Sequence, residues 1–313
     1  MRPAPSPPVG LTPQAAVPSA SPAPIQQAFA PAPAPVPEPA PILRPAPVPF
    51  APPSATEADI LADAPERRAI YRFALQPAIV VLQFPNLAEQ GRMLNRIAAL
   101  IEKQGYPRDR VLSHEELNAR IRASGLTPET FYYGHDYRAA DIIRFFALAS
   151  DLDPEELDLQ ELVLKLGWRE HGSIGALISL VRETPNADID NAARRTILRH
   201  ELSHGVYFTD PAYVQCCYHF WNDVLTPQER VLFTAFLQRE GYDPALTDLI
   251  VNETQAYLIH THDRRFFRPV DVGLTEARAD QLRRIFIADM PPGWLRDATL
   301  LPEPSQHIPV RAP

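Results

Sequence analysis

The chain has 313 residues, 36 of them proline, and a formal net charge of −8 at pH 7. This acidic balance excludes the basic stripe with which proteins bind a phosphate backbone, so nucleic acid is not an expected partner. No apolar run approaches the roughly 18 to 20 residues that a transmembrane helix needs, so no transmembrane segment is expected. Ordinary apolar content from about residue 57 onward predicts a folded globular part.

Residues 1–56 differ from the rest in composition. They contain 19 of the 36 prolines and few large apolar side chains. Such Pro/Ala repetition favours an extended, disordered tether of polyproline II type. Tethers of this kind often follow a membrane anchor or an export signal, so export to the periplasm or the cell surface is one interpretation of the composition. No signal peptide is visible, and a cytoplasmic location stays open. Residues 301–313 are expected to form a flexible tail.

The globular part is expected to be mostly helical. Enrichment in Val and Ile predicts a buried strand at 78–84. Residues 86–89 then have the form of a capping box, which predicts a helix ending near Gly105. A second capping box at 113–116 begins a helix that Gly125 ends. Further helices are expected at 138–150, 154–166, 226–240 and 275–288.

The segment 173–181 is ambiguous, because its apolar run SIGALISLV suits a helix or a buried strand. The distinction matters, because an exposed strand edge beside a catalytic site can bind an extended peptide by strand addition. Asp190 or Asn191 can cap the helix that follows. Asp210 and Pro211 are expected to end that helix.

The helix after this cap carries the motif His200-Glu201-Leu202-Ser203-His204. Residues four apart lie on one face of a helix, so both histidines could bind one metal ion. Glu201 stands beside the first histidine, where its carboxylate could address a water bound to that ion. The spacing therefore predicts a zinc site, with Zn²⁺ as the expected cofactor.

A catalytic zinc ion usually takes three protein ligands, so a third donor must be found. Glu253 lies in a predicted helix, LTDLIVNETQAYLIH, within the apolar stripe rather than opposite it. A carboxylate directed at a core is costly unless it is paired or bound to a metal, which makes Glu253 a candidate ligand. Asp210, six residues after His204, is the second candidate.

His200, Glu201 and His204 resemble the signature of the zincin metallopeptidases. In the gluzincin branch of that family the third ligand is a glutamate on a later helix, often in an Asn-Glu pair followed by small residues. Residues 252–256, which include Glu253, are similar to that pattern. The predicted elements indicate an α+β, predominantly helical fold with an N-terminal mixed α/β subdomain at 57–180. The resemblance implies that the helical part at 181–300 is a zincin-like catalytic region.

In the metzincin branch the pattern extends to HExxHxxGxxD, and Asp210 occupies its last place. The glycine of that pattern corresponds to Tyr207 here. A tyrosine incurs a steric cost in the backbone conformation that glycine adopts freely, which favours Glu253 over Asp210 as the third ligand.

The resemblance implies hydrolysis of a peptide bond, with a peptide or protein as the substrate. Glu201 would act as the general base on the zinc-activated water and later deliver the proton to the leaving amine. Tyr257, four residues after Glu253, could donate a hydrogen bond to the developing oxyanion. His260, His262 and Tyr207 are rivals for this role.

Two other classes of function remain open at this level. The protein could be a non-catalytic metal-binding module, although such a module has no use for Glu201 as a base. It could also be a protein-interaction domain displayed on a Pro-rich arm, which predicts no bound zinc. A melting experiment with and without a chelator separates the last class from the other two.

Overall fold

A computed structural model describes residues 50–169, 172–183 and 189–300, and from Phe50 on they belong to one compact unit. Most of the expected tether, and the expected tail at 301–313, lie outside the described residues. Ser54 and Ala55, which the composition assigned to the tether, form a short strand that pairs with Arg72 and Phe73. Within the described residues no helix combines the length and the apolar character that crossing a bilayer requires.

The sheet has five strands in the spatial order β1-β2-β3-β5-β4. The strands are β1 (Ser54–Ala55), β2 (Ala69–Phe73), β3 (Ile79–Phe84), β4 (His135–Arg138) and β5 (Ala176–Val181). β3 is the strand expected at 78–84, and the ambiguous segment 173–181 contains β5, which runs parallel to β3. Every residue of β3 and β5 is buried, as expected for central strands that are covered on both faces.

Helices make up most of the described chain, so the expected α+β, predominantly helical class is confirmed. The helices of the first part are α1 (Glu57–Ala62), α2 (Leu87–Ile101), α3 (His114–Ala123), α4 (Ala139–Leu148) and α5 (Pro154–Lys165). Those of the second part are α6 (Asn191–Thr209), α7 (Pro211–His219), α8 (Pro227–Arg239), α9 (Thr247–Gln255), α10 (Glu276–Asp289) and α11 (Trp294–Leu300). Two π-helical segments, η2 (Phe220–Val224) and η3 (Ala256–His260), and the 3₁₀ segment η4 (Pro269–Val272) complete the elements.

Local sequence signals explain most helix boundaries. Asn86 accepts a hydrogen bond from the Glu89 backbone at the beginning of α2. The capping box expected at 113–116 is formed at the beginning of α3, and Gly125 follows that helix with a φ of 84°. The strand β4, which immediately precedes α4, was not predicted.

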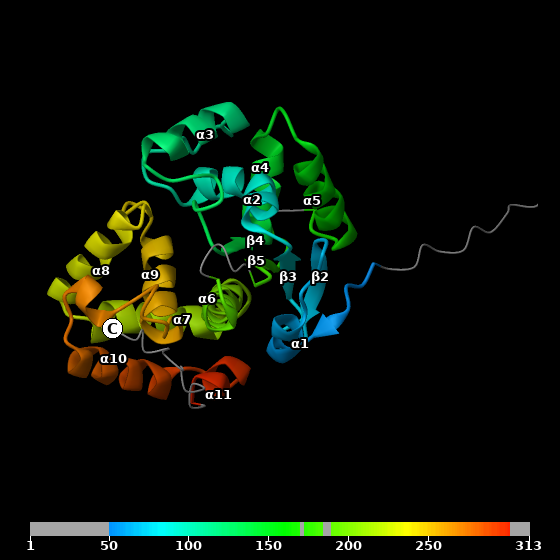
Figure 1. Cartoon of the computed structure of the whole chain (residues 1–313). Coiled ribbons are helices and arrows are strands. Elements are labelled where there is room, and N and C mark those ends of the chain that lie inside the picture. Colours follow the sequence, from blue (N-terminus) through cyan, green and yellow to red (C-terminus); the bar gives the residue numbers. More distant parts are fainter. Residues whose placement is uncertain (1–49, 170–171, 184–188, 301–313) are drawn as a thin grey trace, which may run out of the picture. The chain divides into compact units, whose positions relative to one another are not determined.

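Helices cover the sheet on both faces (Figure 1). Alternation along β4 shows which helix lies on which face, because successive side chains of a strand point in opposite directions. The His135 ring lies 3.2 Å from the Asn95 side chain of α2. The next residue, Asp136, points the other way, and its Oδ2 lies 3.8 Å from His204 Nε2 of α6. The sheet thus presents an acidic side chain to the helix that carries the HELSH motif.

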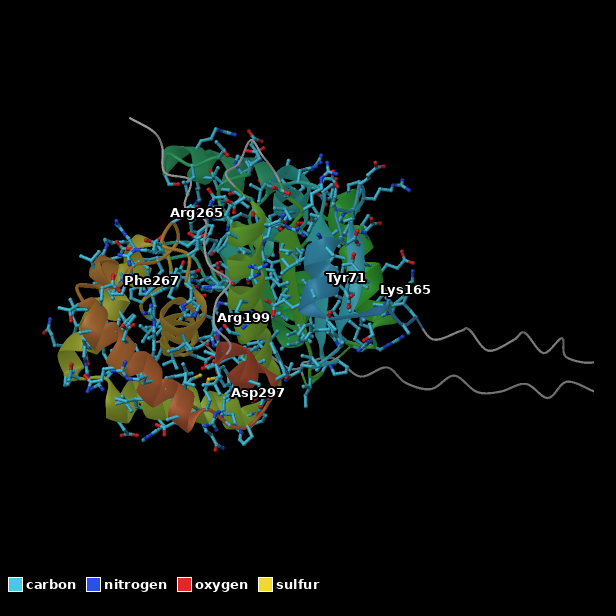
Figure 2. The ribbon with its side chains drawn as sticks, turned by 60° about the horizontal axis from the view of Figure 1, so that its bottom comes forward. Tyr71, Lys165, Arg199, Arg265, Phe267 and Asp297 are labelled. Atoms are coloured by element: carbon cyan, nitrogen blue, oxygen red, sulfur yellow. The ribbon has the colours of Figure 1, made fainter. Side chains whose placement is uncertain are left out.

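Ion pairs connect helices that are distant in sequence. Arg199 of α6 donates to Glu57 Oε2 of α1 at 2.7 Å, and Figure 2 labels Arg199 on its helix. Arg96 of α2 is almost completely buried, and its Nη1 lies 2.8 Å from Glu156 Oε2 of α5, which is also buried. The same guanidinium contacts Asp151 Oδ1 at 2.8 Å. Arg96 therefore compensates a carboxylate that has no access to water.

We expect Arg96→Met to lower the free energy of unfolding by about 3–5 kcal/mol, because the buried Glu156 carboxylate loses its closest cation. Urea denaturation measures this change. Arg264→Met is the matched control, since it removes the cation of an exposed pair with Glu276, and it should change the free energy by less than about 1 kcal/mol. Equal unfolding midpoints for the two variants would contradict the role assigned to Arg96.

Candidate metal centre

The helix α6 holds the two histidines of the HELSH motif in fixed positions. Asp190 caps it by accepting a hydrogen bond from Ala193 N at 2.8 Å. Gly205 allows the helix to pack closely on β3, because a Cβ at this position would lie 2.7 Å from Ile79 Cδ1. This close contact fixes α6 on the sheet, so that His204 approaches both Asp136 of β4 and Glu253 of α9.

His200 and His204 lie one turn apart, and their Nε2 atoms are separated by 3.0 Å. Glu253 on α9 completes the group, since its Oε2 lies 3.7 Å from each of these nitrogens. Glu253 is 1% exposed. The structure thus brings together the three ligands selected from the sequence, in a group that could hold a metal ion.

Asp210, the alternative third ligand, lies elsewhere. Its side chain accepts a hydrogen bond from Ala212 N at 2.9 Å and caps α7. Within the described part of the chain, it belongs to none of the groups whose donor atoms converge closely enough to hold an ion.

The tautomer of His200 follows from its neighbour Thr261. The Thr261 hydroxyl donates its single hydrogen to the Ala256 carbonyl at 3.0 Å. It must therefore accept from His200 Nδ1, which lies 2.8 Å away. A neutral imidazole carries one N–H, so His200 Nε2 has a free lone pair directed at the centre of the group.

The protonation of the two histidines suits a cation. Burial, followed by the neighbouring His204, holds the pKa of His200 well below its usual range, and burial lowers the pKa of His204 to about 4. Both rings are therefore neutral near pH 7, which is the form that binds a metal. Burial and the nearby Asp136 and Glu102 carboxylates raise the pKa of Glu253 well above its ordinary value.

Buried carboxylate oxygens without a hydrogen-bond partner support a bound cation at this group. Among the described residues, Glu253 Oε2 and Glu201 Oε2 are buried and have no hydrogen-bond partner. A buried acceptor without a partner is costly. A cation held by His200, His204 and Glu253 would satisfy Glu253 Oε2.

One residue that sequence reasoning missed is Asp136. Its carboxylate, that of Glu201 and a ring nitrogen of His204 form a second close group that could hold an ion. Burial and the neighbouring Asp141 carboxylate raise the pKa of Asp136 to about 7. Burial and then Asp136 also raise the pKa of Glu201, so these two side chains compete for ionisation.

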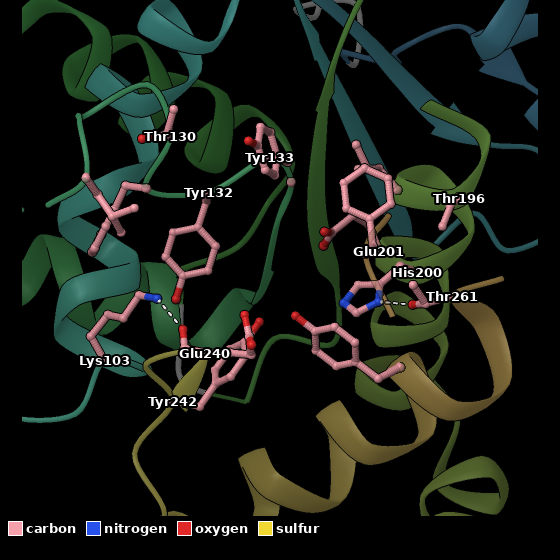
Figure 3. Close-up of a pocket in the computed structure, with 16 residues that line it drawn as sticks. Lys103, Thr130, Tyr132, Tyr133, Thr196, His200, Glu201, Glu240, Tyr242 and Thr261 are labelled. Atoms are coloured by element: carbon pink, nitrogen blue, oxygen red, sulfur yellow. Dashed lines mark hydrogen bonds between the residues drawn. The ribbon is translucent and has the colours of Figure 1, made fainter. Parts of the chain in front are cut away.

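Glu201 also lines a pocket of about 250 Å³. Figure 3 shows Glu201 beside His200 on one wall of this pocket. A Cβ at Gly134 would lie 2.2 Å from Glu201 Oε1, so the glycine lets the chain that enters β4 pass close to this carboxylate. The carboxylate thus lies at the boundary between the candidate ligands and an open space.

Of the four candidates for an oxyanion donor, Tyr257 is the one that lines this pocket. Its ring centroid lies 5.0 Å from that of His200. The Tyr207 hydroxyl donates to Asp248 at 2.6 Å, and His260 contacts the Tyr213 hydroxyl at 3.0 Å. His262 also lies outside the pocket lining.

No protein-family model, curated protein or solved structure matches this chain. The function proposed below therefore rests on the geometry of the site.

A third close group, His114 with Asp153 and Glu156, has a structural explanation. Asp153 and Glu156 form the capping box of α5, and Arg96 already pairs with Glu156. A bound cation would have to compete with that guanidinium, so we assign this group to the stability of α5.

We expect Thr261→Val to weaken metal binding about 10- to 100-fold, because His200 Nδ1 loses the acceptor that orients the ring. Competition with a chromophoric chelator measures the affinity. Thr254→Val is the matched control: its hydroxyl is also buried, but it donates to the Ile250 carbonyl and contacts neither histidine. Equal affinities of the two variants would show that the Thr261 hydroxyl does not orient His200.

Proposed function

We propose that this protein is a zinc-dependent metallopeptidase of the gluzincin-like type. The observation that carries this proposal is the convergence of His200 Nε2, His204 Nε2 and Glu253 Oε2, with separations of 3.0, 3.7 and 3.7 Å. Glu201 borders both this group and the pocket. A purely structural metal site has no need of an additional carboxylate beside an open space.

The separations suit a tetrahedral ion. Zinc bonds of about 2.0–2.2 Å to nitrogen and oxygen place neighbouring ligand atoms about 3.4 Å apart in tetrahedral geometry. The three separations bracket this value. Three protein ligands also leave a fourth position for water, which is typical of catalytic rather than structural zinc. Two imidazoles and one carboxylate can also bind iron, so metal identity is part of the test.

Zinc supplies an acidic bound water and polarises the carbonyl of the scissile bond when it is present. The chain's own residues would carry the proton. The carboxylate of Glu201 accepts it from the attacking water and delivers it to the leaving amine. Burial raises the pKa of Glu201, which makes its carboxylate a stronger base, as this proton transfer requires. The hydroxyl of Tyr257 remains protonated because burial raises its pKa, so it can donate to the oxyanion.

The position of β4 fits an extended peptide substrate. Within the described chain β4 pairs with β5 alone, so its second edge carries no strand partner. Gly134, which precedes β4, lines the pocket beside Glu201. A peptide that adds to this edge would run past the candidate base, as in strand-addition complexes.

We expect the purified protein to contain about one zinc ion per chain. Glu253→Ala should lose the ion, because two histidines bind zinc much more weakly than three ligands do, whereas Asp210→Ala should retain it. Elemental analysis measures both, and a chelator should lower the melting temperature of the wild-type protein. Loss of the ion only in Asp210→Ala would overturn the proposed ligand set, and iron in place of zinc would overturn the assignment of the metal.

We expect Glu201→Gln to retain zinc and to lose at least about 100-fold of the hydrolytic rate, because the amide cannot accept the proton. The assay is cleavage of a mixed peptide pool, followed by mass spectrometry. Glu240→Gln, which replaces an exposed carboxylate at the same pocket, is the control. If Glu201→Gln cleaves peptides as fast as the control, Glu201 is not the general base.

A further inference from the structure

Lys103 lies on the wall of the pocket opposite His200 and Glu201 (Figure 3). The residue follows the end of α2 and is 8% exposed. Its ammonium group donates to the Glu240 carbonyl at 3.2 Å. A buried lysine at the far end of a pocket from a candidate metal centre is unusual, because burying a charge is costly without a partner.

Aromatic rings surround this ammonium group. Lys103 Nζ lies 4.9 Å from the ring centroid of Phe131, 4.3 Å from that of Tyr132 and 5.5 Å from that of Tyr242. The faces of aromatic rings attract a cation, and they also exclude water from it. The rings therefore stabilise the charge, while among the described residues the ammonium group has one hydrogen-bond acceptor, the Glu240 carbonyl.

In the described chain no carboxylate oxygen lies within 4.0 Å of Lys103 Nζ, although acidic residues surround it. The adjacent Glu102 accepts a hydrogen bond from the Tyr132 hydroxyl at 2.8 Å instead. Glu240, whose carbonyl contacts the ammonium, has an exposed side chain. The strongest acceptor for a buried ammonium, a carboxylate in direct contact, is thus not provided by the neighbouring residues.

We propose that Lys103 binds a carboxylate of the peptide substrate, so that the pocket selects peptides with a negative charge close to the scissile bond. The proposal rests on the proposed peptidase function. A carboxylate in this pocket would contact the free ammonium hydrogens in surroundings shielded from water, where the attraction is stronger than at the surface. It would also orient the peptide, with its charged end at Lys103 and a carbonyl group beside His200 and Glu201.

Two groups on a peptide offer this chemistry. One is the α-carboxylate at the C-terminus, which would make the enzyme remove residues from the end of a chain. The other is the side chain of Asp or Glu, which would direct cleavage inside a chain. Lys103 would recognise both through the same ion pair, and the experiment distinguishes them.

A structural role is the competing explanation. Burial lowers the pKa of Lys103, and the nearby Glu102 and Glu253 carboxylates oppose this effect, so the lysine could serve only to balance buried negative charge. In that case its removal would alter stability and metal affinity. It would not alter the preference between two substrates that differ only in one carboxylate.

The test compares short mixed-sequence peptides prepared as free acids and as C-terminal amides, with Glu or Gln at each inner position. We expect the zinc-loaded wild-type protein to favour one carboxylate-bearing set by about 10- to 100-fold in kcat/KM, as a charged hydrogen bond would supply. A preference for free acids identifies the C-terminus, and a preference for Glu over Gln identifies a side chain. Lys103→Met should abolish the preference, and Lys103→Arg should retain most of it.

Calorimetry measures the affinity of the same peptides for the zinc-loaded Glu201→Gln variant. It therefore shows the preference for a carboxylate in the absence of turnover. If the wild-type protein cleaves no peptide, the proposed peptidase function fails. If it cleaves acids and amides, and Glu and Gln peptides, at equal rates, only the assignment of Lys103 fails. A preference that persists in Lys103→Met also overturns this assignment. Zinc content and melting temperature verify the fold of each variant, and Lys103→Gln replaces Lys103→Met if that variant does not fold.

Discussion

Burial of several carboxylates in one place is the constraint on which the site depends. Glu102, Asp136, Glu201 and Glu253 act on one another, and burial raises the pKa of each. Four such groups cannot all be ionised in a low-dielectric region without positive charge nearby. Lys103 supplies one positive charge, so the remainder must come from protons or from a bound cation. The two neutral histidines among these carboxylates provide the donors that a divalent cation requires.

The fold assembles the candidate metal centre and the carboxylates around it from segments that are distant in sequence. The helix α6 contributes His200 and His204, α9 contributes Glu253, and β4 contributes Asp136. Each of these elements is held by contacts away from the site, such as the close packing of Gly205 on Ile79. The costs of burying polar groups at the site are therefore offset by the apolar core around the sheet. Such a separation between a costly site and a stabilising core is common where function requires groups that do not stabilise the fold.

The parts of the site that follow local rules were predictable, and those that depend on strand pairing were not. His200, Glu201 and His204 are visible because their spacing matches the helical repeat. Glu253 was found because a charged residue in an apolar stripe is out of place. The alternative ligand Asp210 caps α7 instead, and an Asp before a Pro is typical of a helix cap.

Asp136, Thr261 and Lys103 were missed for different physical reasons. Asp136 belongs to a four-residue strand that lies directly before a helix, and its orientation depends on pairing with β5, about 40 residues later. Thr261 contacts His200 because it follows the π-helical turn η3, which shifts the phase of the helix beyond Glu253. The residue four positions after Glu253 is Tyr257, whereas Thr261 is the residue that contacts His200 Nδ1.

The buried carboxylates around the pocket explain why positive charge at both of its ends would increase the affinity for an acidic substrate. A pocket lined by Glu201 and Glu240 should repel a carboxylate unless positive charge outweighs these groups. An ion held by His200, His204 and Glu253 would neutralise the acidic group at one end, and Lys103 would attract the substrate at the other. Metal binding would therefore increase affinity for an acidic peptide through the field alone, without a change in shape. Because such coupling is reciprocal, an acidic peptide should also strengthen retention of the metal.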